Sequence, residues 1–274
     1  MARRDGPPQY ESMLERTGSV RPAAREIRVL EADPDLARQL DPAAAREAVR
    51  RVRVRVATVP EGRWDPRLRG DAGGALGLLV LDGVISRRVS IGEANSTELL
   101  GSGDIARPWQ TEGDGGLIPC EATWEVIHAA RLAVLDRGFV EQIAPWPGLT
   151  AELFARTVRR SRWQALAVAI GHLKRVDLRL LIVMWHLAER WGRVTPKGVV
   201  IPLNLTHERL ARLIGAQRPS VTTALNGLID RDVLSRRSDR SWLLRPRAQD
   251  ELDLMCAQVS GSDGALRAGL LDAA

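Results

Sequence analysis

The stretch from residue 206 to residue 230, THERLARLIGAQRPSVTTALNGLID, constrains the fold more than any other part of the chain. Thr206 supplies a hydroxyl suited to cap a helix, and Gly215 ends that helix because glycine accepts the left-handed backbone conformation. Pro219 falls in the first turn of a second helix, where its missing N–H costs no hydrogen bond. We expect the apolar face of the first helix to consist of Leu210, Leu213 and Ile214. The buried stripe of the second helix should consist of Val221, Leu225, Leu228 and Ile229. Two short helices joined by a glycine-containing turn predict a helix-turn-helix.

The segment after the second helix, VLSRRSDRSWLL, predicts a short β-hairpin. Its strands are expected at 233–235 and 241–244, and its turn carries Arg236, Arg237 and Arg240. A hairpin with three arginines beside a helix-turn-helix has the form of a wing that contacts DNA.

Positive charge is concentrated where this motif lies. Residues 206–247 contain nine arginines and four acidic residues, a local excess of five out of the net charge of +6 for the whole chain. The outer side of the second helix has no acidic residue before Asp230 and presents Arg218, Ser220, Thr222, Thr223 and Asn226. These features favour double-stranded DNA as a partner, because phosphates require a cationic surface. A winged helix that serves only protein contacts is the alternative.

The N-terminal half is rich in patterns typical of β-strands. From Val52 the run VRVRV alternates valine with arginine, which predicts a half-buried strand. The run LGLLVLDGVISRRV places two apolar segments around Asp82-Gly83, a dipeptide typical of a tight hairpin turn. Residues 124–135 are expected to form a further strand, and frequent glycines separate the short segments between 70 and 116. This pattern predicts an antiparallel β-sandwich or barrel that ends near Pro147.

A long helix is expected next, from about residue 150 to residue 173, because one seam of residues recurs alternately three and four positions apart. The seam consists of Ala151, Phe154, Val158, Ser161, Ala165, Val168 and His172. A helix of roughly 35 Å is too long for a small sandwich to cover, so we expect the seam from Phe154 to Val168 to hold a homodimer. An ordinary amphipathic core helix is the alternative. A second helix at 177–191, apolar on most sides, is expected to be buried, and a hairpin to follow at 193–200.

Length and composition limit the class of protein. At about 100–200 residues per domain, 274 residues predict two domains. No segment reaches the ~18 apolar residues of a membrane span, so we expect a cytoplasmic protein with no membrane partner. Cys120, Cys256 and the four histidines lack the spacing of a metal or disulfide site, so no cofactor is expected. The expected parts are a mobile tail at 1–25, a β-rich domain at 26–147, a dimerisation helix and hinge at 148–176, a winged helix-turn-helix at 177–247 and a C-terminal tail at 248–274.

The string LTHERLARLIGAQRPSVTTALNGLIDRDVL resembles the winged helix-turn-helix of the cyclic-AMP receptor protein/FNR (CRP/FNR) family of bacterial transcription regulators. The preceding order of β-rich domain, long helix and short helix is similar too, so the resemblance covers about residues 26–247. It implies an α+β fold with a cyclic-nucleotide-binding-like jelly roll. It also implies a homodimer that binds a near-palindromic operator, with half-sites one helical turn of DNA apart.

The resemblance assigns roles by position. Arg218 falls where family members use an arginine to pair with guanine O6 and N7, and Thr222 and Thr223 are expected to read bases in the next turn. Many members have an acidic residue where this chain has Pro219 and an arginine where it has Thr223, so the base sequence that is read should differ. Phosphate contacts, which position a protein without specifying sequence, are expected from Thr206, Ser220, Arg236, Arg237 and Arg240.

The expected effector site departs from the cyclic-nucleotide pattern. Gly103-Asp104 is not followed by the glutamate that holds the ribose, and GGLIPCEATW lacks the arginine that meets the cyclic phosphate. Because a buried phosphate without a cation is costly, binding of cyclic AMP in the usual mode is not expected. Arg107, Trp109 and Trp124 are candidates for a different pocket, although a surface arginine and core tryptophans are the simpler interpretation.

No nucleophile, base and orienting group can be assembled, so the chain is not expected to be an enzyme. RNA polymerase is a further candidate partner if the protein activates transcription, through the 193–200 hairpin and the sandwich surface. The competing class is a cupin-like small-molecule sensor or enzyme that uses the winged helix for oligomerisation.

Overall fold

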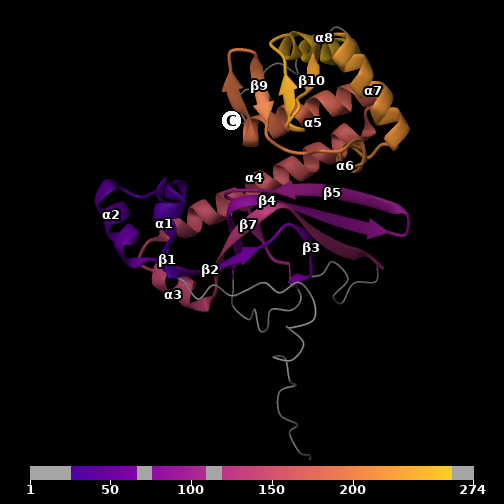
Figure 1. The fold of residues 1–274 in the computed structure, drawn as a ribbon. Coiled ribbons are helices and arrows are strands. Elements are labelled where there is room, and N and C mark those ends of the chain that lie inside the picture. Colours follow the sequence, from indigo (N-terminus) through magenta and orange to yellow (C-terminus); the bar gives the residue numbers. More distant parts are fainter. Residues whose placement is uncertain (1–25, 67–75, 109–118, 261–274) are drawn as a thin grey trace, which may run out of the picture. The chain divides into compact units, whose positions relative to one another are not determined.

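The computed structural model describes residues 26–66, 76–108 and 119–260, and the chain divides into two compact units, residues 1–162 and 163–274 (Figure 1). The expected tail at 1–25, Trp109 and residues 261–274 lie outside the described residues.

The N-terminal unit is built on a seven-stranded antiparallel sheet, which confirms the antiparallel, sheet-rich domain predicted from the sequence. Val54 and Val56 are buried in the second strand while Arg53 and Arg55 are exposed, as the alternating run predicts. The strand order is β1 (Glu26–Arg28), β2 (Arg53–Val59), β7 (Glu121–Leu135), β4 (Gly77–Ile91) and β5 (Ala94–Leu100), with β3 (Gly62–Trp64) paired to β7 and β6 (Ile105–Ala106) paired to β4.

Asp82-Gly83 does not form the hairpin turn predicted from the sequence. Strand β4 continues through both residues, and its register against β7 shifts there, as in a β-bulge. Gly83 has φ +90°, and a Cβ at this position would lie 2.5 Å from the Ala130 Cα atom. The glycine therefore serves a bulge with close backbone approach. The tight turn lies instead between Ile91 and Ala94, which pair across the ends of β4 and β5.

Four helical segments that were not predicted from the sequence belong to this unit. Asp41 and Asp136 begin two of them as side-chain caps: Asp41 accepts from the backbone N–H groups of Ala43 and Ala44, and Asp136 accepts from that of Phe139. The segments are α1 (Val29–Ala32), a 3-10 turn (Pro34–Ala37), α2 (Pro42–Arg51) and α3 (Arg137–Ile143).

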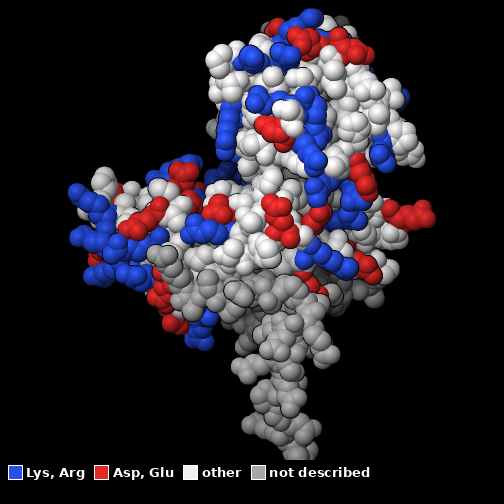
Figure 2. Space-filling model, in the orientation of Figure 1, with Lys and Arg blue, Asp and Glu red and all other residues white. Residues whose placement is uncertain are grey.

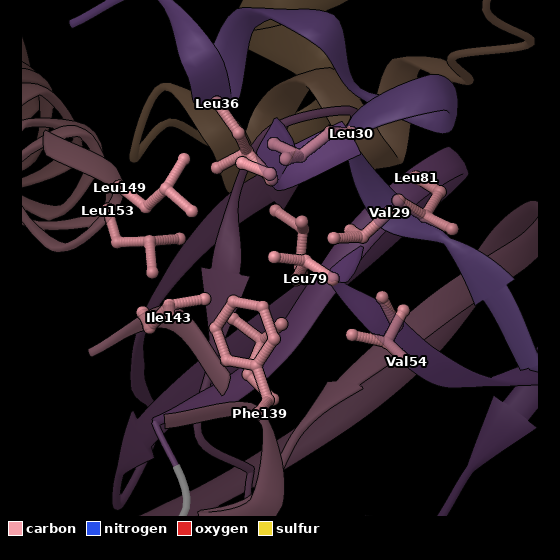
Figure 3. Close-up of a cluster of buried hydrophobic side chains, with 14 of the residues drawn as sticks. Val29, Leu30, Leu36, Val54, Leu79, Leu81, Phe139, Ile143, Leu149 and Leu153 are labelled. Carbon is pink, nitrogen blue, oxygen red and sulfur yellow. The ribbon is translucent and has the colours of Figure 1, made fainter. Parts of the chain in front are cut away.

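These helices cover one face of the sheet. Figure 3 shows Val54 and Leu79 from the strands in one apolar cluster with Leu30 and Phe139 from these helices and Leu149 from the long helix that follows them in the chain. A second cluster is centred on Trp64 and Trp124, whose rings meet edge to face with centroids 5.7 Å apart. Apolar burial on both faces therefore holds the sheet in place.

The predicted long helix is present as α4 (Pro147–His172), which runs through the boundary between the two units. The next helix, α5 (Val176–Trp191), is buried along much of its length, as its composition predicts. None of the described helices combines the length and apolar character needed to cross a membrane.

The C-terminal unit combines helices with a four-stranded antiparallel sheet of order β10-β11-β9-β8. Its helices include α6 (His207–Leu213), α7 (Arg218–Asp230) and α8 (Ala248–Ser260), and its strands are β8 (Arg193–Thr195), β9 (Gly198–Ile201), β10 (Leu234–Arg236) and β11 (Trp242–Leu244). The expectation of a tail from residue 248 is wrong as far as residue 260. Helix α8 buries Ala248, Leu252 and Met255, because the unit supplies an apolar surface that a local pattern does not reveal.

Candidate nucleic-acid interface

Helix α6 begins and ends as the sequence predicts. The Thr206 hydroxyl accepts a hydrogen bond from the Arg209 backbone N–H at 3.2 Å, which caps the helix. Gly215 has φ +62° and ends it in the left-handed conformation. Leu210 and Ile214 are buried, so the helix is anchored on its inner side.

Helix α7 begins at Arg218, with Pro219 in its first turn. Val221, Leu225 and Leu228 are buried, but Ile229 is 39% exposed and does not belong to the buried stripe expected of it. On the outer side, Arg218, Ser220, Thr223 and Asn226 are exposed and Thr222 is half-buried. The structure therefore brings the three predicted base-reading residues, Arg218, Thr222 and Thr223, to one helix.

The hydroxyls of the two threonines are bonded within the protein. Thr222 Oγ1 lies 3.1 Å from the Arg218 carbonyl oxygen and 3.0 Å from His207 Nδ1, and Thr223 Oγ1 lies 3.3 Å from the Pro219 carbonyl oxygen. Burial lowers the pKa of His207 below its ordinary value of 6.5, and the charges of Arg236 and Arg218 lower it further. His207 was not among the site residues predicted from the sequence, because its partner is 15 residues away, across the turn.

Arg236 has a different environment from the other wing arginines. It donates from Nη1 to the Leu205 carbonyl oxygen at 2.8 Å and from Nη2 to Asn204 Oδ1 at 2.9 Å. Its guanidinium carbon lies 4.6 Å from the centroid of the Trp242 ring. Partial burial and the charge of Arg240 lower the pKa of Arg236. Its guanidinium therefore ties the wing to the segment before α6.

The tip of the wing is shaped by Asp239. Its Oδ1 atom accepts hydrogen bonds from the Ser241 backbone N–H at 2.9 Å and from the Ser241 hydroxyl at 2.5 Å. Arg237 lies 3.6 Å from the Asp239 carboxylate, and Arg240 has φ +66° and no ion pair within the described part of the chain. Both arginines are exposed. Figure 2 shows basic side chains interspersed with acidic ones on the visible face of the C-terminal unit.

The structure describes two of the three candidate effector residues, Trp124 and Arg107. Trp124 is buried against Trp64, and the Arg87 guanidinium carbon lies 5.7 Å from its ring centroid. Arg107 is exposed, and Trp109 is outside the described residues. The Gly103-Asp104 turn is present, with Gly103 at φ +86° and an Asp104 carboxylate oxygen accepting from the Gly101 backbone N–H at 2.8 Å.

A buried ionic network, not predicted from the sequence, holds α4 to the rest of the N-terminal unit. Arg156 donates to the two Asp33 carboxylate oxygens at 2.5 and 3.0 Å, to Glu152 at 3.2 Å and to the Gly103 carbonyl oxygen at 3.4 Å. The i, i+4 spacing of Glu152 and Arg156 was the only local signal for it.

A second ionic contact forms one turn further along α4, where Arg160 meets Glu98 of β5. Arg160 donates to Glu98 at 2.5 and 3.1 Å and to the Ile105 carbonyl oxygen at 3.0 Å, and Arg87 donates to Glu98 at 2.7 Å. Burial alone would raise the pKa of Glu98, but the hydrogen bonds and charges of Arg160 and Arg87 outweigh burial and lower it. Through Glu98 and the Ile105 carbonyl group, Arg160 holds the side of α4 that faces the sheet.

The opposite side of α4 carries the predicted seam. Phe154 is 68% exposed and Val168 is 64% exposed. Ser161 and Ala165 are exposed as well, and Val158 is half-buried. A seam that includes two large apolar side chains is thus uncovered in the single chain.

Comparisons with known proteins agree with this architecture. Residues 178–249 match the family model of the Crp-like helix-turn-helix domain. None of the curated proteins matches the chain.

Three solved structures illustrate the similarity of fold. A mutant of CooA from Carboxydothermus hydrogenoformans superposes with a TM-score of 0.57 at 18% identity, covering 73% of this chain and 88% of its own. FixK2 from Bradyrhizobium japonicum gives 0.53 at 15% identity, with coverage of 73% and 97%. A transcriptional regulator of the CRP/FNR family from Thermus thermophilus gives 0.50 at 17%, with coverage of 72% and 97%. The chain therefore has the fold of the CRP/FNR family of transcription regulators, and its residues 178–249 are similar to the Crp-like helix-turn-helix domain.

Proposed function

We propose that the protein is a sequence-specific transcription regulator that binds double-stranded DNA through α7. The observation that carries the proposal is the outer side of this helix, where Arg218, Ser220, Thr223 and Asn226 are exposed next to the exposed arginines of the wing. A helix of this kind fits the major groove, and an arginine at its start suits bidentate pairing with guanine.

The protein acts as a homodimer in this proposal. The uncovered seam of α4 supports it, because Phe154 and Val168 are apolar side chains that a second copy of the helix would bury. A two-fold dimer presents one α7 to each half of a near-palindromic operator, with the half-sites one helical turn apart.

The N-terminal unit either senses a ligand other than cyclic AMP in its usual mode or has lost sensing. Trp124 and Trp64 are buried in the apolar cluster on one face of the sheet, and Arg107 is exposed. The Gly103 and Ile105 carbonyl groups beside the expected nucleotide site accept hydrogen bonds from Arg156 and Arg160 of α4.

If the protein activates transcription, the β8–β9 hairpin is the surface proposed to contact RNA polymerase. Val194 in this hairpin is 87% exposed, the most exposed of the large hydrophobic side chains among the described residues.

Substitution of Arg218 tests the base-reading role. We expect Arg218→Ala to weaken binding to the selected operator by about 1–3 kcal/mol and to relax discrimination at one base pair per half-site. The measurement is selection of bound duplexes from a random pool, followed by titration of the selected duplexes with the wild-type protein and the variant. Arg137→Ala, which removes an equally charged and exposed residue of α3, is the control. An unchanged sequence profile would contradict the assignment, and a wild-type chain that selects no duplex would contradict the proposed function.

Substitutions in the wing should separate two roles. We expect Arg240→Ala to weaken binding to all duplexes about equally and to reduce the slope of log affinity against log salt by about one. Arg236→Ala, which removes two hydrogen bonds to Asn204 and Leu205, should in addition lower the free energy of unfolding by about 1–2 kcal/mol. Salt titrations and denaturant unfolding of both variants make the comparison. Equal stability of the two variants would contradict the role of Arg236 in holding the wing.

A further inference from the structure

We propose that Thr222 and Thr223 read DNA by placing their γ-methyl groups against the C5 methyl groups of thymine, and that His207 positions Thr222 for this contact. The inference rests on the proposed function and adds to it the base feature that the middle of α7 reads.

The hydroxyl of Thr222 is occupied by the protein. It has one proton, and two partners lie within hydrogen-bond distance: the Arg218 carbonyl oxygen at 3.1 Å and His207 Nδ1 at 3.0 Å. If Nδ1 carries the ring proton, it donates to Thr222 Oγ1 and the hydroxyl donates to the carbonyl. If Nδ1 is unprotonated, the hydroxyl donates to the ring instead. In either arrangement no hydroxyl proton remains for a base.

Thr223 follows the same pattern one residue later. Its hydroxyl donates to the Pro219 carbonyl oxygen at 3.3 Å, the bond to the residue four positions back that threonine makes inside helices. The carbonyl of a proline in the first turn is a fixed acceptor, because the ring holds its backbone near helical geometry. Thr223 is exposed, so it faces any duplex that α7 enters.

Neither hydroxyl has a proton left to donate, although each oxygen can still accept a hydrogen bond, and the γ-methyl group is the apolar surface that each side chain offers to a base. In each threonine the oxygen is directed back towards the preceding turn, so the γ-methyl group occupies a different staggered position on Cβ. The C5 methyl group of thymine is the one apolar feature of the major groove, and it marks thymine apart from the other three bases. Contact between two methyl groups needs no hydroxyl proton.

His207 determines the orientation of Thr222. The ring belongs to the first turn of α6, and its bond to Thr222 Oγ1 crosses from α6 to α7. The charged groups that face the ring are Arg236 of the wing and Arg218 of α7, and the Trp242 ring lies 6.5 Å away between centroids. The bond from the ring gives the Thr222 hydroxyl a second partner besides the Arg218 carbonyl oxygen, and it favours the rotamer that Thr222 has in the structure.

The first test uses thymine and uracil, which differ only by the methyl group. In the operator selected by the full-length protein, each thymine is replaced singly by uracil, and affinity is measured by fluorescence anisotropy. We expect at least one thymine per half-site at which uracil weakens binding about fourfold, the value of one buried methyl group. Uracil placed outside the half-sites is the control and should change nothing.

Matched variants assign the effect to a side chain. Thr222→Val and Thr223→Val keep the methyl group and lose the hydroxyl, so they should retain the preference for thymine over uracil. Thr222→Ser and Thr223→Ser keep the hydroxyl and lose the methyl group, so each should remove the preference at its own position. All four changes lie on the outer side of a folded helix, and thermal unfolding followed by circular dichroism checks that the helix is intact.

A third pair of variants tests the role of His207. His207→Ala removes one of the two partners of the Thr222 hydroxyl, leaving only the Arg218 carbonyl oxygen, and should reduce the thymine preference at the Thr222 position, but not at the Thr223 position. His207→Asn keeps a side-chain nitrogen close to the place of Nδ1 and should restore it. A purely structural role for His207 would lower affinity at every position alike and would overturn the positioning assignment.

The failure of this inference differs from the failure of the proposed function. The inference is wrong if duplexes are selected but uracil binds as well as thymine throughout both half-sites. It is also wrong if the serine variants keep a preference for thymine that the valine variants lose, because the hydroxyls or other groups would then read the bases. If the selected half-sites contain no thymine, it is wrong as well. Failure to select any duplex instead contradicts the proposed function.

Discussion

Replacing Arg156 by methionine is expected to lower the free energy of unfolding of the N-terminal unit by about 3–5 kcal/mol. The side chain of Arg156 is 7% exposed, and those of its partners Asp33 and Glu152 are 9% and 2% exposed. Methionine fills a similar volume but leaves two buried carboxylates with less compensation. The loss is that of an unpaired buried charge, which exceeds the net contribution of an intact pair.

Denaturant unfolding, followed by tryptophan fluorescence, measures this change. Arg137→Met is the matched control, because Arg137 pairs with Glu141 at the surface with its side chain 81% exposed. An exposed pair of this kind contributes about 0.3–0.5 kcal/mol, so the control should unfold almost as the wild type does. A loss below about 1 kcal/mol for Arg156→Met would show that the network is not effectively buried in solution.

The pH dependence of stability should change in the same variant. Burial would raise the pKa of Glu152, but the bonds and charges of Arg159 and Arg156 hold it below its ordinary value of 4.5. A carboxyl group with a lowered pKa adds stability that is fully present above 4.5 and is lost as pH falls through the folded-state pKa. Removal of Arg156 should therefore make the free energy of unfolding fall less steeply as pH decreases below 4.5. An unchanged slope would contradict the coupling.

If the proposed dimer forms through the seam of α4, replacing Val168 by glutamate is expected to separate its two copies and to lower affinity for the full operator by about 10²-fold or more. Val168 is 64% exposed in the single chain, and in the proposed dimer its side chain would face a copy of itself across the seam. Two glutamates would then meet in an apolar contact. The loss on DNA is large because the second half-site is bound at a high effective concentration only while the two copies are joined, an advantage of roughly 10²–10⁴.

Sedimentation and titration of full and half operators measure the two effects. Leu166→Glu is the control: Leu166 is 39% exposed and lies two residues from Val168, hence about 200° around the helix axis. It introduces the same charge outside the seam and should leave the dimer intact. If Val168→Glu stays dimeric and binds the operator as before, another surface joins the two copies.

Elements determined by local chemistry could be predicted from the sequence. The boundaries of α6 and α7 follow from the Thr206 cap, Gly215 and Pro219, all of which act within a few residues of their own position. The wing and the exposed seam of α4 follow from short periodic patterns. The winged helix-turn-helix and its outer side were therefore predicted correctly, while Ile229 at its margin was not.

Elements that depend on residues far away in the sequence could not be predicted. Gly83 permits both a hairpin turn and a bulge, and only its closeness to Ala130 on β7 decides between them. Asp33 and Arg156 are 123 residues apart, so no local pattern links them. His207 and Thr222 are separated by a turn whose geometry brings their side chains together. In each case the tertiary fold chooses among options that the local sequence leaves open.

The bonds of Arg236 to Asn204 and Leu205 have a consequence for the kinetics of association. These bonds hold the base of the wing against the segment before α6 before any partner arrives, and Arg237 and Arg240 follow Arg236 in the same hairpin. A preorganised wing loses little rotamer freedom when it meets a phosphate backbone. If the protein binds DNA as proposed, we expect the rate of encounter to respond to ionic strength through these cations, and the lifetime of the complex to depend mainly on α7.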